Sequence, residues 1–215
     1  MTNAEILSHI DHTVLKPDAK WESVAQICTE AMQYHTASVC IPPCWVKTAR
    51  EAFPQLNICT VIGFPLGYQT ASVKAAETKQ AIEDGADEID MVINVSALKS
   101  GDSETVLREM RLVRAACPDA VLKVIIETCL LTESEKILCC KLVTEAGADY
   151  IKTSTGFGSA GAQLEDIALF RKHIGSDVKI KAAGGIRTRE QMEAFLNAGC
   201  DRIGCSAAKI LFDGV

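Results

Sequence analysis

Residues 147–152 read Gly-Ala-Asp-Tyr-Ile-Lys, and residues 153–158 continue with Thr-Ser-Thr-Gly-Phe-Gly. Tyr150 and Ile151 favour extended backbone, whereas the small residues that follow favour a turn. Lys152 is therefore predicted to stand where a buried strand ends. Such a lysine can extend its head to solvent, pair with a carboxylate, or act as an amine nucleophile that forms a Schiff base with a carbonyl substrate.

The pattern occurs twice more, because residues 85–90 read Gly-Ala-Asp-Glu-Ile-Asp and residues 199–204 read Gly-Cys-Asp-Arg-Ile-Gly. Each copy predicts a helix that ends at a left-handed glycine and is followed by a strand. Shared turn chemistry without common ancestry would give the same pattern. In either case Asp90, Lys152 and Gly204 occupy equivalent positions, so they should project in the same direction.

Strand-like and helix-like segments alternate along the whole chain. The predicted strands are 10–15, 37–41, 58–64, 88–94, 121–127, 150–154, 178–183 and 202–206. The predicted helices are 21–34, 46–53, 70–84, 103–116, 132–146, 164–173 and 188–198, with a brief last element at 207–212. Eight strands that alternate with helices predict parallel βαβ units. No linker or low-complexity tract interrupts them, so one domain over residues 1–215 is expected.

The later strands have one apolar face and one charged face. The apolar set is Ile89, Met91, Leu122, Val124, Ile126, Ile151, Val178, Ile180 and Ile203. The charged set is Glu88, Asp90, Lys123, Glu127, Lys152, Lys179, Lys181 and Arg202. Both faces of an open doubly wound sheet lie under helices and should be apolar. The pattern therefore favours a closed (β/α)8 TIM barrel with polar groups inside its upper end.

Composition excludes several classes of protein. The net charge of −6 and pI near 5.3 argue against a general nucleic-acid or membrane surface. No apolar run approaches the ~18 residues of a membrane span, and the first residues lack a signal-peptide pattern. The 10 cysteines include no C-x-x-C pair and the 4 histidines complete no tetrahedral site, so we expect reduced thiols, a cytoplasmic location and no metal.

Glycine-bearing turns follow three neighbouring predicted strands. Residues 156–161 match G-x-G-x-x-G, but a dinucleotide site expects an acidic residue at the end of the next strand, where Lys181 stands. No cofactor is therefore expected. Barrel enzymes often hold phosphate with the loops after strands seven and eight. Ordinary turns are the alternative, but three such turns together favour a phosphate site. Its predicted residues are Gly156, Gly184, Gly185, Gly204 and Ser206.

Three side chains form a candidate catalytic group. Lys152 and Lys181 end neighbouring strands in the same phase. Two ammonium groups in one pocket repel each other, so one of them loses its proton more readily and becomes a nucleophilic amine. Asp90 can carry protons and keep Lys181 charged. This combination predicts an aldolase that needs no metal.

The sequence also resembles the deoxyribose-phosphate aldolase family along nearly its whole length. The stretches that carry the resemblance are 11–16 (Asp-His-Thr-Val-Leu-Lys), 39–41 (Val-Cys-Ile), 61–67 (Val-Ile-Gly-Phe-Pro-Leu-Gly), 88–94 (Glu-Ile-Asp-Met-Val-Ile-Asn), 123–127 (Lys-Val-Ile-Ile-Glu), 150–157 (Tyr-Ile-Lys-Thr-Ser-Thr-Gly-Phe) and 179–187 (Lys-Ile-Lys-Ala-Ala-Gly-Gly-Ile-Arg). The resemblance implies a (β/α)8 barrel and a homodimer. It also implies a class I aldolase that reversibly cleaves 2-deoxy-D-ribose 5-phosphate to acetaldehyde and D-glyceraldehyde 3-phosphate.

The resemblance also implies roles for single residues. Lys152 matches the Schiff-base lysine, Lys181 its perturbing partner and Asp90 the proton relay. Further matches are Asp11, Cys40 and Thr153 on the substrate side, and Gly156, Gly185, Gly204 and Ser206 in the phosphate cradle. Two other readings stay open. One is another phosphate-binding barrel enzyme, such as a different sugar-phosphate aldolase or an epimerase, and the other is a sugar-phosphate-binding regulator without catalysis.

Overall fold

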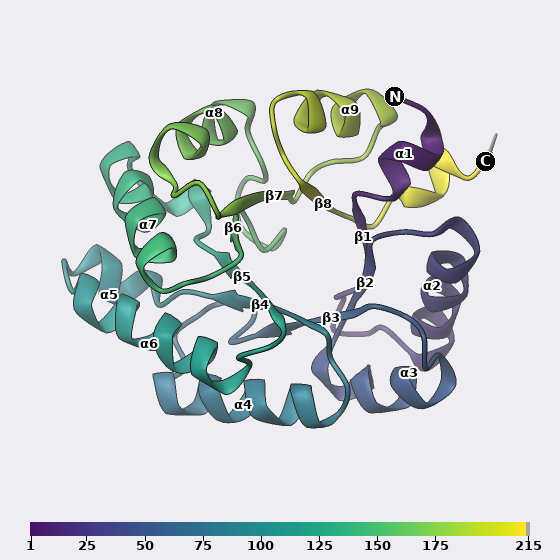
Figure 1. Ribbon diagram of the computed structural model, residues 1–215, viewed down its shortest axis with the longest axis horizontal. Helices are drawn as coiled ribbons and strands as arrows, with labels where there is room; N and C mark the ends of the chain where they lie inside the picture. Colours follow the sequence, from purple (N-terminus) through teal and green to yellow (C-terminus); the bar gives the residue numbers. More distant parts are fainter. Residues whose placement is uncertain (214–215) are drawn as a thin grey trace.

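Eight parallel strands close into a barrel in chain order (Figure 1). The computed structural model describes residues 1–213, so the last two residues of the predicted domain lie outside it. The barrel closes where β1 pairs with β8, with Asp11 beside Gly204. The predicted (β/α)8 fold is thus confirmed. The strands are β1 (Ile10–Thr13), β2 (Ser38–Ile41), β3 (Ile58–Ile62), β4 (Glu88–Val92), β5 (Val121–Ile125), β6 (Tyr150–Lys152), β7 (Lys179–Ala183) and β8 (Arg202–Cys205).

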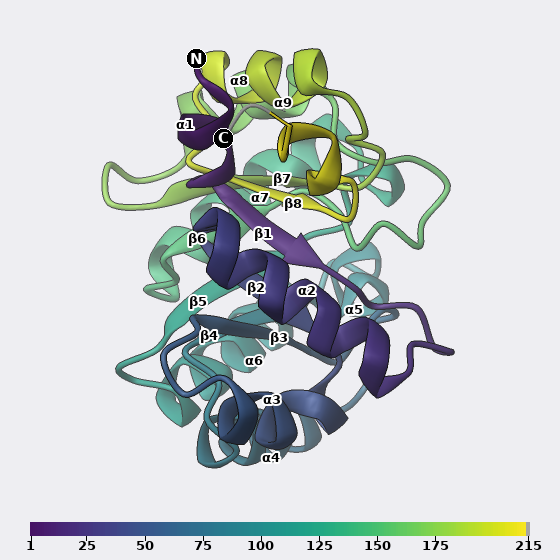
Figure 2. The ribbon, with the colours of Figure 1, turned by 90° about the vertical axis from the view of Figure 1, so that its right-hand side faces the viewer.

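Helices surround the barrel, and each of the first seven strands leads into one of them. They are α2 (Trp21–Tyr34), α3 (Val46–Ala52), α4 (Ala71–Glu83), α6 (Ser103–Ala116), α7 (Glu133–Glu145), α8 (Leu164–His173) and α9 (Arg189–Asn197). The position between α9 and α2 is filled by two short pieces from opposite ends of the chain, α1 (Asn3–Leu7) and the 3-10 turn η3 (Ala208–Leu211) (Figures 1 and 2). The Asn3 side chain joins them by donating to the Leu211 carbonyl at 3.1 Å.

Several short elements were not predicted. They are α1, α5 (Val95–Lys99), η1 (Pro43–Trp45) and η2 (Thr128–Leu130). Elements this short contain too few residues to show a helical period. The predicted ends of several strands were also wrong by two residues. Gly63 and Glu127 adopt φ of 62° and 54°, so β3 and β5 turn away before the apolar sequence ends. Lys152 is the last residue of β6 and lies at the mouth of the barrel.

The repeated Gly-x-Asp pattern forms the same turn three times. Gly147 has φ of 69°, as predicted for a left-handed helix end, and Gly85 and Gly199 also have positive φ. The Asp149 N–H donates to the Leu122 carbonyl at 2.9 Å, and the Asp149 carboxylate accepts the Leu122 N–H at 2.7 Å. Each turn thus ties an even strand to the odd strand before it. The matching pairs are Asp87 with Ile58 and Asp201 with Ile180.

The two faces of the strands separate as predicted. The apolar set, for example Ile151 and Ile180, is buried between the strands and the helices. Most of the charged set fills the barrel and extends further than the predicted upper end, whereas Lys179 is exposed and Glu127 lies beyond the end of β5. Glu88 and Arg202 are the first residues of β4 and β8, so they lie at the opposite end of the barrel interior. Most of this barrel core is therefore held by ion pairs instead of the branched apolar residues common in such barrels.

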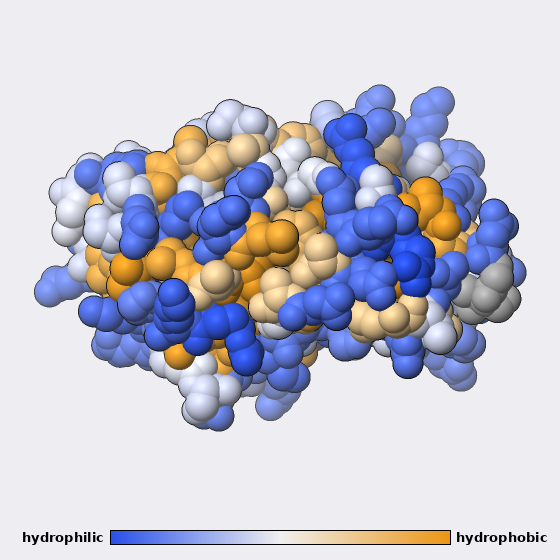
Figure 3. Space-filling model, turned by 90° about the horizontal axis from the view of Figure 1, so that it is seen from above, coloured by the Kyte–Doolittle hydropathy of each residue, from blue (hydrophilic) through white to orange (hydrophobic). Residues whose placement is uncertain are grey.

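Hydrophilic side chains cover much of the surface over α8 and α9, with hydrophobic ones interspersed (Figure 3). Among the helices of residues 1–213, none has the length and apolar character that crossing a bilayer requires.

Candidate active site

The three predicted catalytic residues meet inside the barrel. The Lys152 and Lys181 ammonium groups both donate to Oδ2 of Asp90, at 2.8 and 2.6 Å. Lys123 donates to Oδ1 of the same carboxylate at 2.8 Å. One buried carboxylate on β4 therefore bonds to lysines from β5, β6 and β7. Both carboxylate oxygens of Asp90 accept these bonds, so Asp90 helps to fix the position of each of the three ammonium groups.

Two further carboxylates complete the cluster below Asp90. Asp11 accepts bonds from Lys181, Arg202 and the Ser38 hydroxyl. Glu88 bonds to Lys123 at 2.5 Å and to Arg202 at 3.2 Å. The members of this cluster, called the barrel cluster below, are Asp11, Glu88, Asp90, Lys123, Lys152, Lys181 and Arg202.

The cluster shifts the pKa values of Asp90 and Lys181 in opposite directions. Burial opposes ionisation of Asp90, but Lys123, Lys152 and Lys181 outweigh it and hold the pKa of Asp90 well below its usual range. Burial likewise opposes the charged form of Lys181, yet attraction to Asp11 and Asp90 raises the pKa of Lys181 above the ordinary lysine value. Around neutral pH, Asp90 is therefore a carboxylate and Lys181 an ammonium.

A cavity of ≈ 400 Å³ opens above β6, β7 and β8. Of the barrel cluster, only Lys152 lines it. The Lys152 side chain is 4% exposed, whereas those of Asp90 and Lys181 are 0% exposed. A molecule in this cavity can therefore reach the Lys152 amine, while Asp90 and Lys181 lie beneath it.

One wall of the cavity suits an anion. It contains all five predicted phosphate residues, Gly156, Gly184, Gly185, Gly204 and Ser206. Within the described chain, the N–H groups of Gly184, Gly185 and Ser206 donate to no protein acceptor, so they are free to bind a ligand. Lys16 and Arg187 line the same cavity and add positive charge. We call this side of the cavity the glycine wall.

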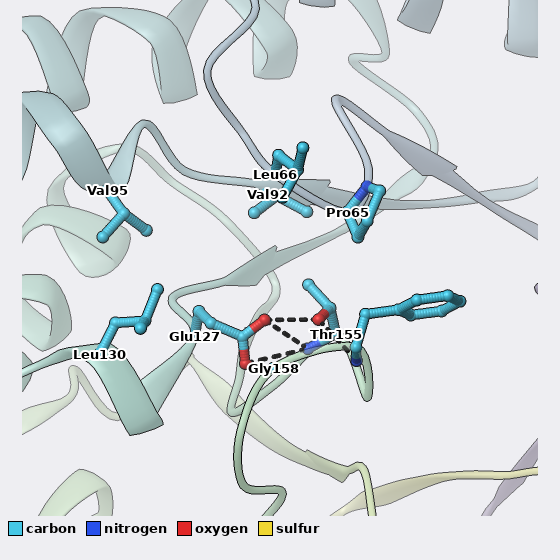
Figure 4. Close-up of a pocket in the computed structure, with 9 residues that line it drawn as sticks. Pro65, Leu66, Val92, Val95, Glu127, Leu130, Thr155 and Gly158 are labelled. Carbon is cyan, nitrogen blue, oxygen red and sulfur yellow. Dashed lines mark hydrogen bonds between the residues drawn. The ribbon is translucent and has the colours of Figure 1, made fainter.

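A buried glutamate anchors the loop that follows Lys152 (Figure 4). Glu127 has φ of 54°, a region that glutamate rarely adopts, and its side chain is buried. Its carboxylate accepts the Thr155 N–H at 3.3 Å and the Thr155 hydroxyl, which in turn accepts the Phe157 N–H at 3.0 Å. Among residues 1–213, no cation pairs with Glu127. The loop therefore depends on hydrogen bonds to hold Gly156 in the glycine wall.

A family model described as "DeoC/LacD family aldolase" matches residues 6–204. The chain belongs to this aldolase family. A protein from Clostridium botulinum (strain Alaska E43 / Type E3), called deoxyribose-phosphate aldolase, is 58% identical over 215 residues, which cover 100% of this chain and 97% of that protein. A protein of the same name from Brevibacillus brevis is 54% identical over 96% of this chain and 94% of its own length.

Solved structures of similar proteins share the fold of this aldolase. A putative deoxyribose-phosphate aldolase from Coccidioides immitis superimposes with a TM-score of 0.94 at 39% identity, covering 98% of this chain and 85% of that chain. A deoxyribose phosphate aldolase from Aeropyrum pernix, described as having a unique tetrameric structure, gives 0.88 at 32% identity, covering 98% and 91%.

The three predicted substrate-side residues of the aldolase are not part of the cavity lining. Asp11 lies beneath it in the barrel cluster, and Cys40 packs against Cys59 and Val61. The Thr153 hydroxyl both donates to and accepts from the backbone of Ala183. Thr153 follows Lys152 directly, so its side chain points to the other side of the strand. These residues support the site without facing the cavity.

Some residues of the site were missed. Lys123, Glu88 and Arg202 were placed on the charged face by alternation, but nothing in the sequence indicated that they meet around Asp90. That meeting depends on the register between strands, in which Asp90 lies beside Lys123. Lys16 and Arg187 are exposed loop cations, which are common on any surface. The anchoring contact of Glu127 likewise depends on a loop conformation that no sequence pattern indicated.

Proposed function

We propose that this aldolase reversibly cleaves 2-deoxy-D-ribose 5-phosphate to D-glyceraldehyde 3-phosphate and acetaldehyde through a Schiff base on Lys152. The observation that carries the proposal is the position of Lys152, which alone of the barrel cluster lines a cavity that also contains the glycine wall. The names of the similar proteins support the same reaction. An epimerase would need no lysine pair, and a regulator would need no buried proton carrier.

The proposed reaction passes through an iminium ion and then an enamine on Lys152. The Lys152 amine adds to C1 of the open-chain sugar, and the carbonyl oxygen leaves as water to give an iminium ion. The C3 hydroxyl then loses its proton and the C2–C3 bond breaks. The electrons of that bond move toward the iminium nitrogen. D-glyceraldehyde 3-phosphate leaves and an enamine remains. Protonation at C2 and addition of water release acetaldehyde. Asp90 and Lys181 lie beside Lys152 and are the proposed proton carriers.

Charge balance supports a neutral amine in this cluster. Three carboxylates face the cations Lys123, Lys152, Lys181 and Arg202. Loss of one proton leaves three negative and three positive groups, which removes an uncompensated buried charge. Lys152 is the member that a substrate can reach, so it is the amine placed to attack a carbonyl carbon.

Reductive trapping tests the nucleophile. Borohydride added with acetaldehyde should attach an N-ethyl group, about 28 Da, to the peptide that contains Lys152. The Lys152→Arg variant should take up no label, because a guanidinium does not form the imine. Label on Lys181 in the native chain, or no label at all, would contradict the proposal.

A charge placed in the glycine wall tests phosphate binding. Ser206→Glu should raise the KM for deoxyribose 5-phosphate at least tenfold, because carboxylate and phosphate repel each other. Gly204 is a poor site for this test, since a Cβ there would lie 3.2 Å from Cε of Lys181. Ser206→Gln has a similar size without the charge and serves as the control. Equal losses for deoxyribose 5-phosphate and unphosphorylated deoxyribose would place the phosphate elsewhere.

We also propose a homodimer of single-domain subunits that works in the cytoplasm. The similar protein from Aeropyrum pernix is described as tetrameric, so a tetramer is the alternative to the proposed dimer. Sedimentation at micromolar concentration separates a dimer from a tetramer.

A further inference from the structure

A second cavity, of ≈ 360 Å³, lies beside the catalytic cavity, and we call it the side cavity. Leu15 and Phe157 line both cavities. Phe64 also lines the side cavity, and its ring meets that of Phe157 edge-on with centroids 5.3 Å apart. The volume is about ten times the ≈ 30 Å³ that one water occupies in the liquid, which is enough for a short hydrocarbon chain.

The chemistry of the side cavity is opposite to that of the glycine wall. Its lining includes four of the chain's 6 prolines, namely Pro17, Pro42, Pro43 and Pro65. Proline has no N–H to donate and a fixed φ, so this wall offers few hydrogen bonds and is already ordered before a ligand arrives. The charged lining residue, Glu77, already accepts the Gly63 N–H at 2.8 Å. A polar substituent would gain little here.

We propose that the side cavity binds the hydrocarbon chain of an unphosphorylated alkanal whose carbonyl carbon reacts with Lys152. This inference rests on the proposed function. The amine adds to the carbonyl carbon, water leaves and an imine forms, while the chain passes Leu15 and Phe157 into the side cavity. The glycine wall and the proline-lined cavity thus give one lysine two classes of carbonyl substrate, one anionic and one apolar.

A chain-length series tests the inference on the unmodified protein. Acetaldehyde, propanal, butanal and hexanal are each added at increasing concentration in the presence of borohydride. Label on the Lys152 peptide is measured by mass spectrometry. Burial of one methylene tightens binding about threefold to fourfold. The concentration for half-maximal labelling should therefore fall about threefold for each added methylene. Equal concentrations across the series would overturn the inference.

A tryptophan in the side cavity tests where the chain lies. Pro43→Trp should fill the cavity and flatten the chain-length series, whereas Pro118→Trp, at an exposed proline outside the cavity, should keep it. If the concentration for half-maximal labelling still falls with chain length in Pro43→Trp, the inference is overturned. A second measurement does not depend on that variant folding. Saturating inorganic phosphate should leave hexanal labelling unchanged, and competition would place the chain at the glycine wall and overturn the inference.

Two controls separate this inference from the proposed function. Cleavage of deoxyribose 5-phosphate and acetaldehyde labelling of Lys152 are measured in the same preparation. Absence of either contradicts the proposed function itself. If both are present and the series is flat, only the side-cavity inference fails.

Discussion

Lys181 shows how the barrel interior sets the charge of one residue. Its side chain is fully buried, and its ammonium group contacts Asp11 and Asp90 from two different strands. Two carboxylates outweigh the cost of burial and raise the pKa of Lys181, so it remains charged next to Lys152. The contact with Asp11 means that this lysine also contributes to stability.

Replacing Lys181 with leucine should therefore affect activity and stability together. We expect kcat to fall about 100-fold or more through loss of proton transfer. We expect the free energy of unfolding to fall by about 3–5 kcal/mol, because buried carboxylates lose a cation. Adding Asp11→Asn should recover part of the stability but not the activity. Urea unfolding and steady-state kinetics measure both.

Lys179 offers a matched control on the same strand. It is exposed, so Lys179→Leu should change the free energy of unfolding by less than about 0.5 kcal/mol. Equal destabilisation by both leucines, or no recovery in the Asp11→Asn double variant, would contradict the role given to the buried pair.

At the scale of elements, the loop after β6 depends on its contact with the end of β5. Glu127→Ala removes the acceptor for Thr155 and should raise the KM for deoxyribose 5-phosphate about tenfold, since one hydrogen bond to a charged group is worth about 1.5–3 kcal/mol. The KM for unphosphorylated deoxyribose should change much less. Kinetics with the two sugars provide the measurement.

Conservative variants show whether Glu127 positions the loop or takes part in the chemistry. Glu127→Gln keeps an acceptor oxygen and Thr155→Ser keeps the hydroxyl, so both should recover most of the affinity. If Glu127→Ala instead lowers kcat equally for both sugars and leaves KM unchanged, Glu127 acts on the reacting atoms.

The sequence predicts long elements better than short ones. The helix at 103–116 was predicted with its observed bounds, because its fourteen residues cover several turns. Thr70, predicted to open a helix at 70–84 with a capping hydroxyl, stands at the N-cap position just before α4, but its hydroxyl contacts Ser72 and does not cap the helix. The left-handed Glu127 ends β5 early although nothing in its identity favours that conformation. Its hydrogen bonds to Thr155 supply the reason.

For the whole molecule, the barrel cluster predicts how stability varies with pH. The pKa values of Asp11 and Asp90 are depressed, so their contribution is present above the ordinary value of ~3.9 and is lost as pH falls through the lower folded values. The pKa values of Lys123 and Lys181 are raised, so their contribution is present below ~10.4 and is lost as pH rises through the folded values.

The cluster should thus contribute fully from about pH 4 to pH 10. Below that window, the free energy of unfolding should fall by about 1.4 kcal/mol per pH unit for each depressed carboxylate. The Asp11→Asn variant should show a shallower acid slope. Urea unfolding from pH 3 to pH 9 measures it, and identical slopes for both proteins would contradict this account.

The fold and the meeting of Asp90, Lys152 and Lys181 could be predicted because both follow from strand phase. Alternation places Asp90, Lys152 and Lys181 inside the barrel, whichever way the loops run. Lys123 has the same phase, but its partner is set by pairing between β4 and β5, which a single strand does not encode. The cavity lining depends on loop conformation, which strand phase does not encode, so the substrate-side assignment of Asp11 and Thr153 stays a prediction although neither residue lines the cavity.

The three Gly-x-Asp turns have a consequence for recombination between related genes. They join β3 to β4, β5 to β6 and β7 to β8, and both hydrogen bonds of a turn lie within one such pair. A crossover between β4 and β5, or between β6 and β7, keeps these two bonds of each turn within one parent, and cuts only the bond that the Asp87 or Asp149 carbonyl accepts from the next strand. A crossover inside a pair takes the turn aspartate from one parent and the odd strand that its carboxylate bonds from the other. We therefore expect an exchange of two-strand units to disturb the barrel less than a cut inside a pair, because it keeps each turn aspartate with the odd strand that its carboxylate holds.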